Sequence, residues 1–229
     1  MSTRRDEIAI ALTSCNYIYR LLKQVFAGEP SPELVQALTD EFTEEVLTLL
    51  LSEESLAPYK ELFAQLKQAV SANPDKTIGY LKSEFVYLMW GPGQLPAPPW
   101  ESVYVNKTRM LFQQSTLEVR RAYLEYNLLP AEYPHVADDH IAIELDFLAQ
   151  LGQLAEESLE AGDIPKLQKI LSGQKEFLEK HLLVWIGDFA REIQSSKTHY
   201  LYPQMACLTK ELLHASHSAL TEMICAIAN

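Results

Sequence analysis

The fold of this chain depends on one stretch, Leu88-Met-Trp-Gly-Pro-Gly-Gln-Leu-Pro-Ala-Pro-Pro-Trp-Glu-Ser-Val-Tyr104. It contains four of the twelve prolines. Proline fixes φ at about −65° and removes a backbone donor, so the residues from Gly91 to Pro99 cannot form a helix. They are predicted to be an extended connector between two helical halves. Because the stretch also carries two tryptophans, Leu95 and Tyr104, it must pack into the body or receive a ligand.

Composition indicates a folded, acidic protein. The chain has 229 residues, of which 48% are hydrophobic, and this is enough for a sizeable core. Its formal net charge of −12 argues against nucleic acid as a partner, because phosphates require a basic face. The same charge suits a basic partner, although solubility is its more common cause.

Cysteine usage and hydropathy indicate a cytoplasmic protein. Cys15, Cys207 and Cys225 have neither a pairing pattern nor metal-ligand spacing, which predicts buried, reduced thiols. No run approaches the ~20 apolar residues of a membrane span, so no stable membrane insertion is expected. Arg4-Arg5 is followed at once by two acids and a short apolar stretch, which predicts neither a secretory nor a twin-arginine signal at this end.

The first half of the chain reads as helices. Apolar residues at three- and four-residue spacing predict a helix over residues 5–27. Ser31-Pro32-Glu33 supplies the N-cap, first-turn proline and early acid that begin the next one. Two short helices are expected up to about Leu51, followed by helices over 55–72 and 75–90. Strand signals are absent, since there is no sustained alternation and no Asn-Gly hairpin.

The second half continues in the same way. Ser115-Thr-Leu-Glu118 has the capping-box pattern and predicts a helix to about Tyr126. After a loop over residues 127–137, Asp138-Asp139 is predicted to cap a long helix that Gly162 ends.

A further cap, Asp163, precedes a helical region over residues 164–195, with an interruption expected near Gly173. The last helix begins at Tyr202-Pro203. The sequence therefore predicts an all-α protein of about nine to eleven helices. We expect a single domain over residues 1–229, with an N-terminal half (1–90), a connector (91–100) and a C-terminal half (101–229).

The segment Asp138-Asp139-His140 is the first candidate for chemistry. His140 and Glu144 share a helix face at i, i+4, so a helical metal-dependent hydrolase using these four residues is one hypothesis. The structural alternative is a double N-cap, since acids at a helix start accept backbone N–H groups. No second metal-ligand cluster is visible, and metal analysis of the purified protein separates the two hypotheses.

Two other patterns favour structure over catalysis. Glu211-Leu-Leu-His214 has the spacing of di-iron bundles, but such bundles need two copies of this motif and the chain has one. Phe177, Trp185 and Phe189 lie in helical register and predict an aromatic stripe that faces the core. Phosphate loops and nucleophile elbows are also absent. The sequence therefore predicts no catalytic residue, no metal and no cofactor.

Three blocks, in this order, resemble the TorD/DmsD family of chaperones for molybdoenzyme maturation. The stretch Leu88–Tyr104 resembles the family's Leu-Phe-x-Gly-Pro…Pro-Pro-Trp-x-Ser-Val block. Ala137-Asp-Asp-His-Ile141 is similar to its Asp-His segment, and Phe177-Leu-Glu-Lys-His-Leu-Leu-Val-Trp185 to its His-Leu-x-x-Trp helix. Val136-Ala137 stands where many members have Glu-Pro, and Val184 where many have Pro, which leaves the client and the subfamily open.

The resemblance implies an all-α, non-enzymatic, cytoplasmic chaperone. Such a protein binds the twin-arginine leader peptide of a DMSO- or TMAO-reductase-like client and delays its export until the molybdopterin cofactor is inserted. The implied partners are this leader and the apo-form of the catalytic subunit, with cofactor-biosynthesis or export machinery as further partners. The leader-site residues carried over are Phe85, Pro99, Trp100, Glu101, Tyr104, Asp138, Asp139 and His140.

The chemistry of these residues fits a leader that offers two guanidinium groups followed by an apolar stretch. Phe85, Trp100, Tyr104 and the prolines are expected to line an apolar groove. The acidic end of that groove is expected to consist of Glu84, Glu101, Asp138 and Asp139, since arginine's planar fork suits carboxylates. Structural alternatives remain open: Trp100 as a core aromatic, Asp139 as a cap only, and His140 as a packed histidine.

Overall fold

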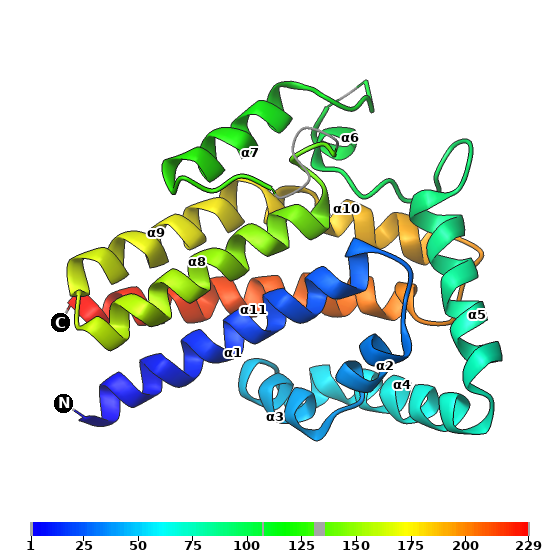
Figure 1. Ribbon diagram of the computed structural model, residues 1–229, viewed down its shortest axis with the longest axis horizontal. Coiled ribbons are helices and arrows are strands. Elements are labelled where there is room, and N and C mark those ends of the chain that lie inside the picture. The colour runs from blue at the N-terminus through cyan, green and yellow to red at the C-terminus, as the bar shows by residue number, and fades with distance from the viewer. Residues whose placement is uncertain (1, 107, 131–135, 229) are drawn as a thin grey trace.

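Long helices form the centre of the fold. The computed structural model describes residues 2–106, 108–130 and 136–228, and within them it has helices and no strand, so the all-α prediction is confirmed. The central bundle consists of α1 (Ser2–Ala27), α8 (Ile141–Ala161), α9 (Ile164–Lys180), α10 (Leu182–Ser195) and α11 (Tyr202–Ala228) (Figure 1). Within the described residues no helix is long and apolar enough to cross a membrane.

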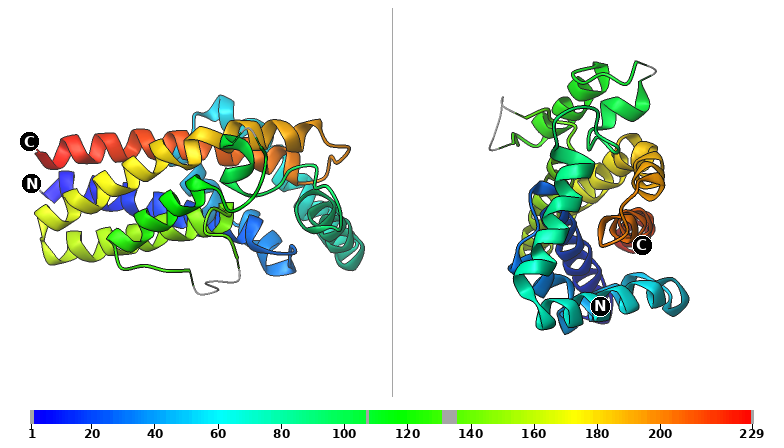
Figure 2. Two further views of the ribbon diagram at one scale, coloured as in Figure 1. Left: turned by 90° about the horizontal axis from the view of Figure 1, so that it is seen from above. Right: turned by 90° about the vertical axis from the view of Figure 1, so that its right-hand side faces the viewer.

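Four helices from the first half of the chain pack beside the bundle (Figures 1 and 2). They are α2 (Pro32–Leu38), α3 (Glu41–Leu50), α4 (Glu53–Ala72) and α5 (Pro74–Phe85). The start signal at Ser31 is confirmed, because its hydroxyl accepts a hydrogen bond from the backbone of Leu34. A π-helical segment, η1 (Val86–Trp90), extends α5 up to the connector.

The connector is non-helical from Gly91 to Pro99, as predicted, and is partly packed into the body. The N–H of Ala97 donates to the carbonyl of Leu88 at 3.3 Å, and both Ala97 and Pro99 are buried. Residues 92–94 are exposed, as is Trp90 at the end of η1, which is 66% exposed. A short helix that the sequence did not predict, α6 (Glu101–Val105), follows directly.

Two helices begin within a few residues of the predicted positions, but their predicted capping side chains are wrong, because those side chains bind tertiary partners instead. Helix α7 (Gln114–Glu125) begins before Ser115 and has no side-chain cap. The buried Ser115 hydroxyl instead accepts a hydrogen bond from the Asn106 amide. At α8 the N-cap is His140, whose Nδ1 accepts from the Ala142 N–H at 3.1 Å, so Asp138-Asp139 is not a double cap.

The helical region after Gly162 breaks at a different residue from the one predicted. Gly162 has a left-handed φ of 72° and Asp163 caps α9, both as expected. The interruption, however, lies at His181, and Gly173 is inside α9. Gly173 has a packing role, because a Cβ there would lie 1.8 Å from the hydroxyl oxygen of Tyr126 at the end of α7.

This close approach gives a stability prediction. Replacing a helical glycine by alanine normally stabilises by about 1 kcal/mol. We expect that gain for Gly187→Ala in α10, where a Cβ meets nothing within 4 Å. Gly173→Ala should lose most of the gain or destabilise, because Tyr126 must leave its place. Urea melts of the two variants measure the difference, and equal gains would contradict the packing role of Gly173.

Candidate functional site

The connector end and the Asp-His segment lie side by side. The N–H of Ile141 donates to the carbonyl of Pro99 at 2.9 Å, and the N–H of Glu101 donates to the carbonyl of Asp139 at 2.9 Å. Between these two hydrogen bonds Trp100 and His140 form an isolated antiparallel bridge, with their ring centroids 5.4 Å apart. We call this paired region, Pro99–Glu101 with Asp139–Ile141, the clamp.

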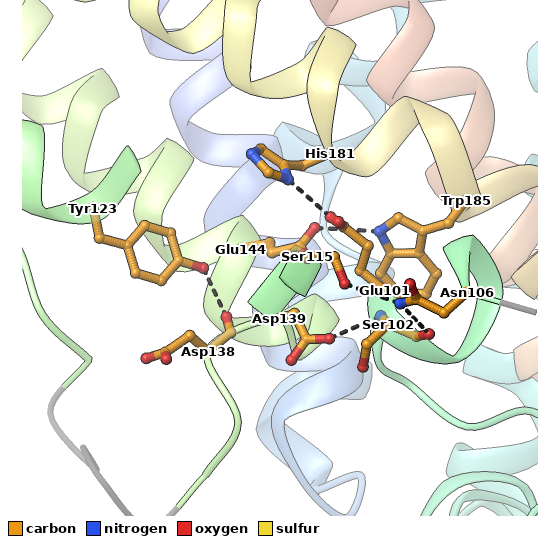
Figure 3. Close-up of polar contacts among 10 residues, drawn as sticks. All are labelled: Glu101, Ser102, Asn106, Ser115, Tyr123, Asp138, Asp139, Glu144, His181 and Trp185. Carbon is orange, nitrogen blue, oxygen red and sulfur yellow. Dashed lines mark hydrogen bonds and ion pairs between the residues drawn. The ribbon is translucent and has the colours of Figure 1, made fainter. Parts of the chain in front are cut away.

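The side chain of Asp139 forms a hydrogen bond with the chain that follows the connector. It is buried, and its Oδ2 accepts a hydrogen bond from the backbone N–H of Ser102 at 2.8 Å (Figure 3). Ser102 lies in the first turn of α6, where N–H groups have no partner within the helix and the dipole favours a negative charge. Asp139 therefore supplies a cap to α6 rather than to α8, and it acts across 37 residues of sequence.

Asp138 attaches α7 to the clamp. Its Oδ2 lies 2.6 Å from Nη2 of Arg120 and 2.8 Å from Nε of the same residue. The backbone carbonyl of Asp138 accepts a hydrogen bond from the hydroxyl of Tyr123 at 2.9 Å (Figure 3). Since Asp138 is fully buried, the Arg120 guanidinium is needed to balance its charge.

A second pair of buried acids consists of Glu101 at the end of the clamp and Glu144 in α8. Oε2 of Glu101 is 3.0 Å from Nδ1 of His181, and Oε2 of Glu144 accepts a hydrogen bond from the Trp185 indole at 3.4 Å (Figure 3). The carboxyl groups of Glu101 and Glu144 are close enough for each to shift the pKa of the other. His181 and Trp185 come from the third sequence block, so all three blocks meet in this region.

Burial sets the protonation of this pair. It raises the pKa of Glu144 well above its ordinary value, and the neighbouring carboxylates of Glu101 and Asp139 raise it further. The pKa of Glu101 is also raised by burial, although His181 opposes the shift. The fully buried Glu144 therefore keeps its proton to a higher pH than a free glutamate does. Burial lowers the pKa of His140 to about 4, which agrees with a neutral Nδ1 that accepts from Ala142.

The aromatic residues of the predicted site lie at different depths. Tyr104 is half-buried and stacks on Trp185 with ring centroids 5.3 Å apart. Trp100 and His140 are also half-buried. Pro99 and the acids Glu101, Asp138 and Asp139 are buried, so the surface of the site consists of Trp100, Tyr104 and His140.

Two predicted residues lie elsewhere. The ring of Phe85 contacts Trp90 and Tyr202, and it belongs to the core around α11. Glu84 is buried too, and its carboxylate accepts hydrogen bonds at 2.8–3.2 Å from the backbone of residues 200–202. Glu84 therefore caps the start of α11 and does not form the acidic end of a groove.

The hydrolase hypothesis gains no support from the geometry. Its four residues have four different partners: Arg120 for Asp138, Ser102 for Asp139, Ala142 for His140 and Trp185 for Glu144. No group of three or more His, Cys, Asp or Glu residues in the described part of the chain could hold a metal ion. Sequence reasoning did not single out Arg120, Ser102 or His181 as partners, although Ser102 and His181 lie in the first and third family blocks.

The family of the chain follows from comparison with known proteins. The model of the nitrate reductase delta subunit family matches residues 52–191, so the chain belongs to that family. Over 191 residues the chain is 27% identical to the chaperone protein TorD of Vibrio atlanticus, with 83% of this chain and 87% of that protein covered. The resemblance to the TorD/DmsD chaperones is thereby confirmed.

Two further proteins agree with this. A protein of Haemophilus influenzae described as a probable Tat proofreading chaperone DmsD is 25% identical over 155 residues, which cover 68% of this chain and 66% of that protein. A crystal structure described as that of a redox enzyme maturation protein from Archaeoglobus fulgidus has a TM-score of 0.51 at 18% identity. It covers 87% of this chain and 93% of that one, and it shows the same fold.

The protonated Glu144 gives a pH prediction. Its folded pKa lies above the ordinary value of 4.5, so the unfolded chain ionises first and the wild type loses stability as the pH rises above about 4.5. Glu144→Gln keeps an oxygen acceptor for the Trp185 indole and cannot ionise. We expect it to raise the unfolding free energy by roughly 1–3 kcal/mol at pH 8 and to change it little at pH 4. Urea melts at both pH values measure this, and a loss at pH 8 would contradict a protonated Glu144.

Proposed function

We propose that this chain is a cytoplasmic chaperone that binds the twin-arginine leader peptide of a molybdopterin-containing oxidoreductase of the DMSO- or TMAO-reductase type. It assists insertion of the cofactor and delays export until the client has folded. Its partner is the apo-form of the catalytic subunit with the leader still attached. The observation that carries the proposal is the meeting of all three family blocks at the clamp, with Trp100, Tyr104 and His140 at the surface.

The surface of the site suits the apolar part of a leader. Trp100 and Tyr104 offer aromatic area, and both are fixed by neighbours: Trp100 by the His140 ring and Tyr104 by Trp185. Prolines fix the chain that leads to Trp100. A surface held in this way loses little conformational entropy on binding, which favours affinity for a peptide that is itself flexible.

The acids beneath this surface support the cationic part of the proposal. Asp138 and Asp139 each retain one buried carboxylate oxygen that has no hydrogen-bond partner among the described residues. Buried acceptors without donors cost free energy, so a guanidinium that reached them would be favoured. The net charge of −12 attracts a basic peptide over longer distances.

Capture of the client tests the proposed function directly. The tagged chain is expressed in anaerobically grown cells, and co-purifying peptides are identified by mass. We expect the precursor of a molybdopterin oxidoreductase catalytic subunit, recovered with its leader intact. Recovery of only the mature, leaderless enzyme, together with no heat on titrating the leader at high micromolar concentration, would contradict leader binding.

The exposed aromatic surface gives a mutational prediction. Trp100→Ala should weaken leader binding by about 2 kcal/mol, the loss typical of a central aromatic anchor. The loss should depend little on salt, since it comes from apolar area rather than charge. Trp90→Ala is the matched control, because it removes an exposed tryptophan from the other end of the connector. Calorimetry at low and high salt, beside urea melts, measures both, and equal affinities for the two variants would count against the site.

A further inference from the structure

An internal arginine already occupies a guanidinium site next to Tyr104. Nη1 and Nη2 of Arg109 donate to Oε1 and Oε2 of Glu192 at 2.7 and 3.0 Å, a two-bond fork. The guanidinium carbon also lies 5.5 Å from the centre of the Tyr104 ring. A carboxylate fork beside an aromatic face is the arrangement that recognises arginine in preference to lysine.

Glu192 is partly exposed to solvent, unlike the acids in and next to the clamp. Its side chain is 28% exposed, whereas Glu101, Asp138 and Asp139 are buried with internal partners. It also lines a hollow of about 640 Å³ between α10 and the connector. Arg109 lines the same hollow, together with residues 94–96 of the connector. A peptide lying along the connector therefore has access to this carboxylate.

The loop that carries Arg109 is held in a costly conformation. Arg109 has φ 51° and Phe112 has φ 57°, values in the left-handed region that residues other than glycine rarely adopt. Such strain in an exposed loop points to a functional constraint. The residues that follow Arg109 are apolar and exposed: Met110, Leu111 and Phe112. The loop therefore has an arginine followed by apolar residues, which is also the order of residue types in the leader peptide.

We propose that Glu192 and Tyr104 form a subsite for one arginine of the leader, and that Arg109 is an internal competitor which the leader displaces. This inference rests on the proposed function and adds to it the residues that read the guanidinium group. The leader arginine takes the place of Arg109 on the Glu192 carboxylate, so one two-bond ion pair replaces another. Because Glu192 is already paired before the leader binds, binding adds little cost for removing water from its charge. Release of Arg109 also lets its loop leave the left-handed conformation.

Competition of this kind lowers the affinity for the leader by an amount that can be measured. If Arg109 occupies the subsite for nine-tenths of the time, the apparent affinity for an external ligand falls about tenfold. Arg109→Asn removes the guanidinium, and asparagine tolerates φ > 0, so the loop conformation is retained. The variant should therefore bind the leader about tenfold more tightly than the wild type.

The test uses a synthetic peptide with two consecutive arginines followed by about twelve apolar residues, titrated by calorimetry. Adding Glu192→Gln to Arg109→Asn should remove the gain and weaken binding about tenfold relative to Arg109→Asn alone. Glu44→Gln is the matched control, since it also removes one exposed glutamate that forms an ion pair, here with Lys60. A peptide with both arginines replaced by glutamine should not distinguish the variants.

Unchanged or weaker binding by Arg109→Asn, with wild-type melting behaviour, would overturn the subsite. If no protein binds the peptide, the proposed function fails, and arginine amide then tests the subsite on its own. We expect it to perturb the fluorescence of Trp185, which stacks on Tyr104, in Arg109→Asn but not in the double variant. Equal responses of these two proteins to arginine amide would overturn the subsite independently of any leader.

Discussion

Two backbone hydrogen bonds, from Ile141 to Pro99 and from Glu101 to Asp139, fix the geometry on which the rest of the site depends. Prolines have no N–H, so the proline-rich connector has few donors with which to attach itself to the body. At the end of the connector, the carbonyl of Pro99 accepts a hydrogen bond and the N–H of Glu101 donates one. Both bonds are made with the segment that leads into α8. This attachment positions Trp100 beside His140 at the surface and directs Glu101 into the interior.

Burying acids beneath a binding surface is costly, and the chain compensates each one differently. Asp138 has a guanidinium, Asp139 a helix start, Glu101 a histidine, and Glu144 a retained proton. The first three partners lie on separate elements, so these acids join α7, α6 and the α9–α10 junction at the clamp. A network of this kind contributes less to stability than apolar packing would, but it holds the surface in one arrangement.

The helices were predictable because their signals are local. Apolar periodicity and the caps at Ser31 and Asp163 involve residues within one turn of each other. The failures have a common cause in tertiary contacts. Asp139 was predicted to cap the helix that follows it, but it caps α6. Gly173 was predicted to break a helix, but it lies inside α9 and leaves room for the Tyr126 side chain. Family resemblance indicated which blocks meet, whereas the internal pairing of the acids depends on partners that no sequence spacing reveals.

Amide hydrogen exchange with and without the leader peptide tests the central claim most directly. If the clamp carries the leader-binding surface, the peptide should slow exchange of the Glu101, Ser102 and Ile141 amides, because binding suppresses local opening of the two segments. Slowing should also extend along residues 100–105. Unchanged exchange at these amides, with protection of another part of the chain at saturating peptide, would contradict the account.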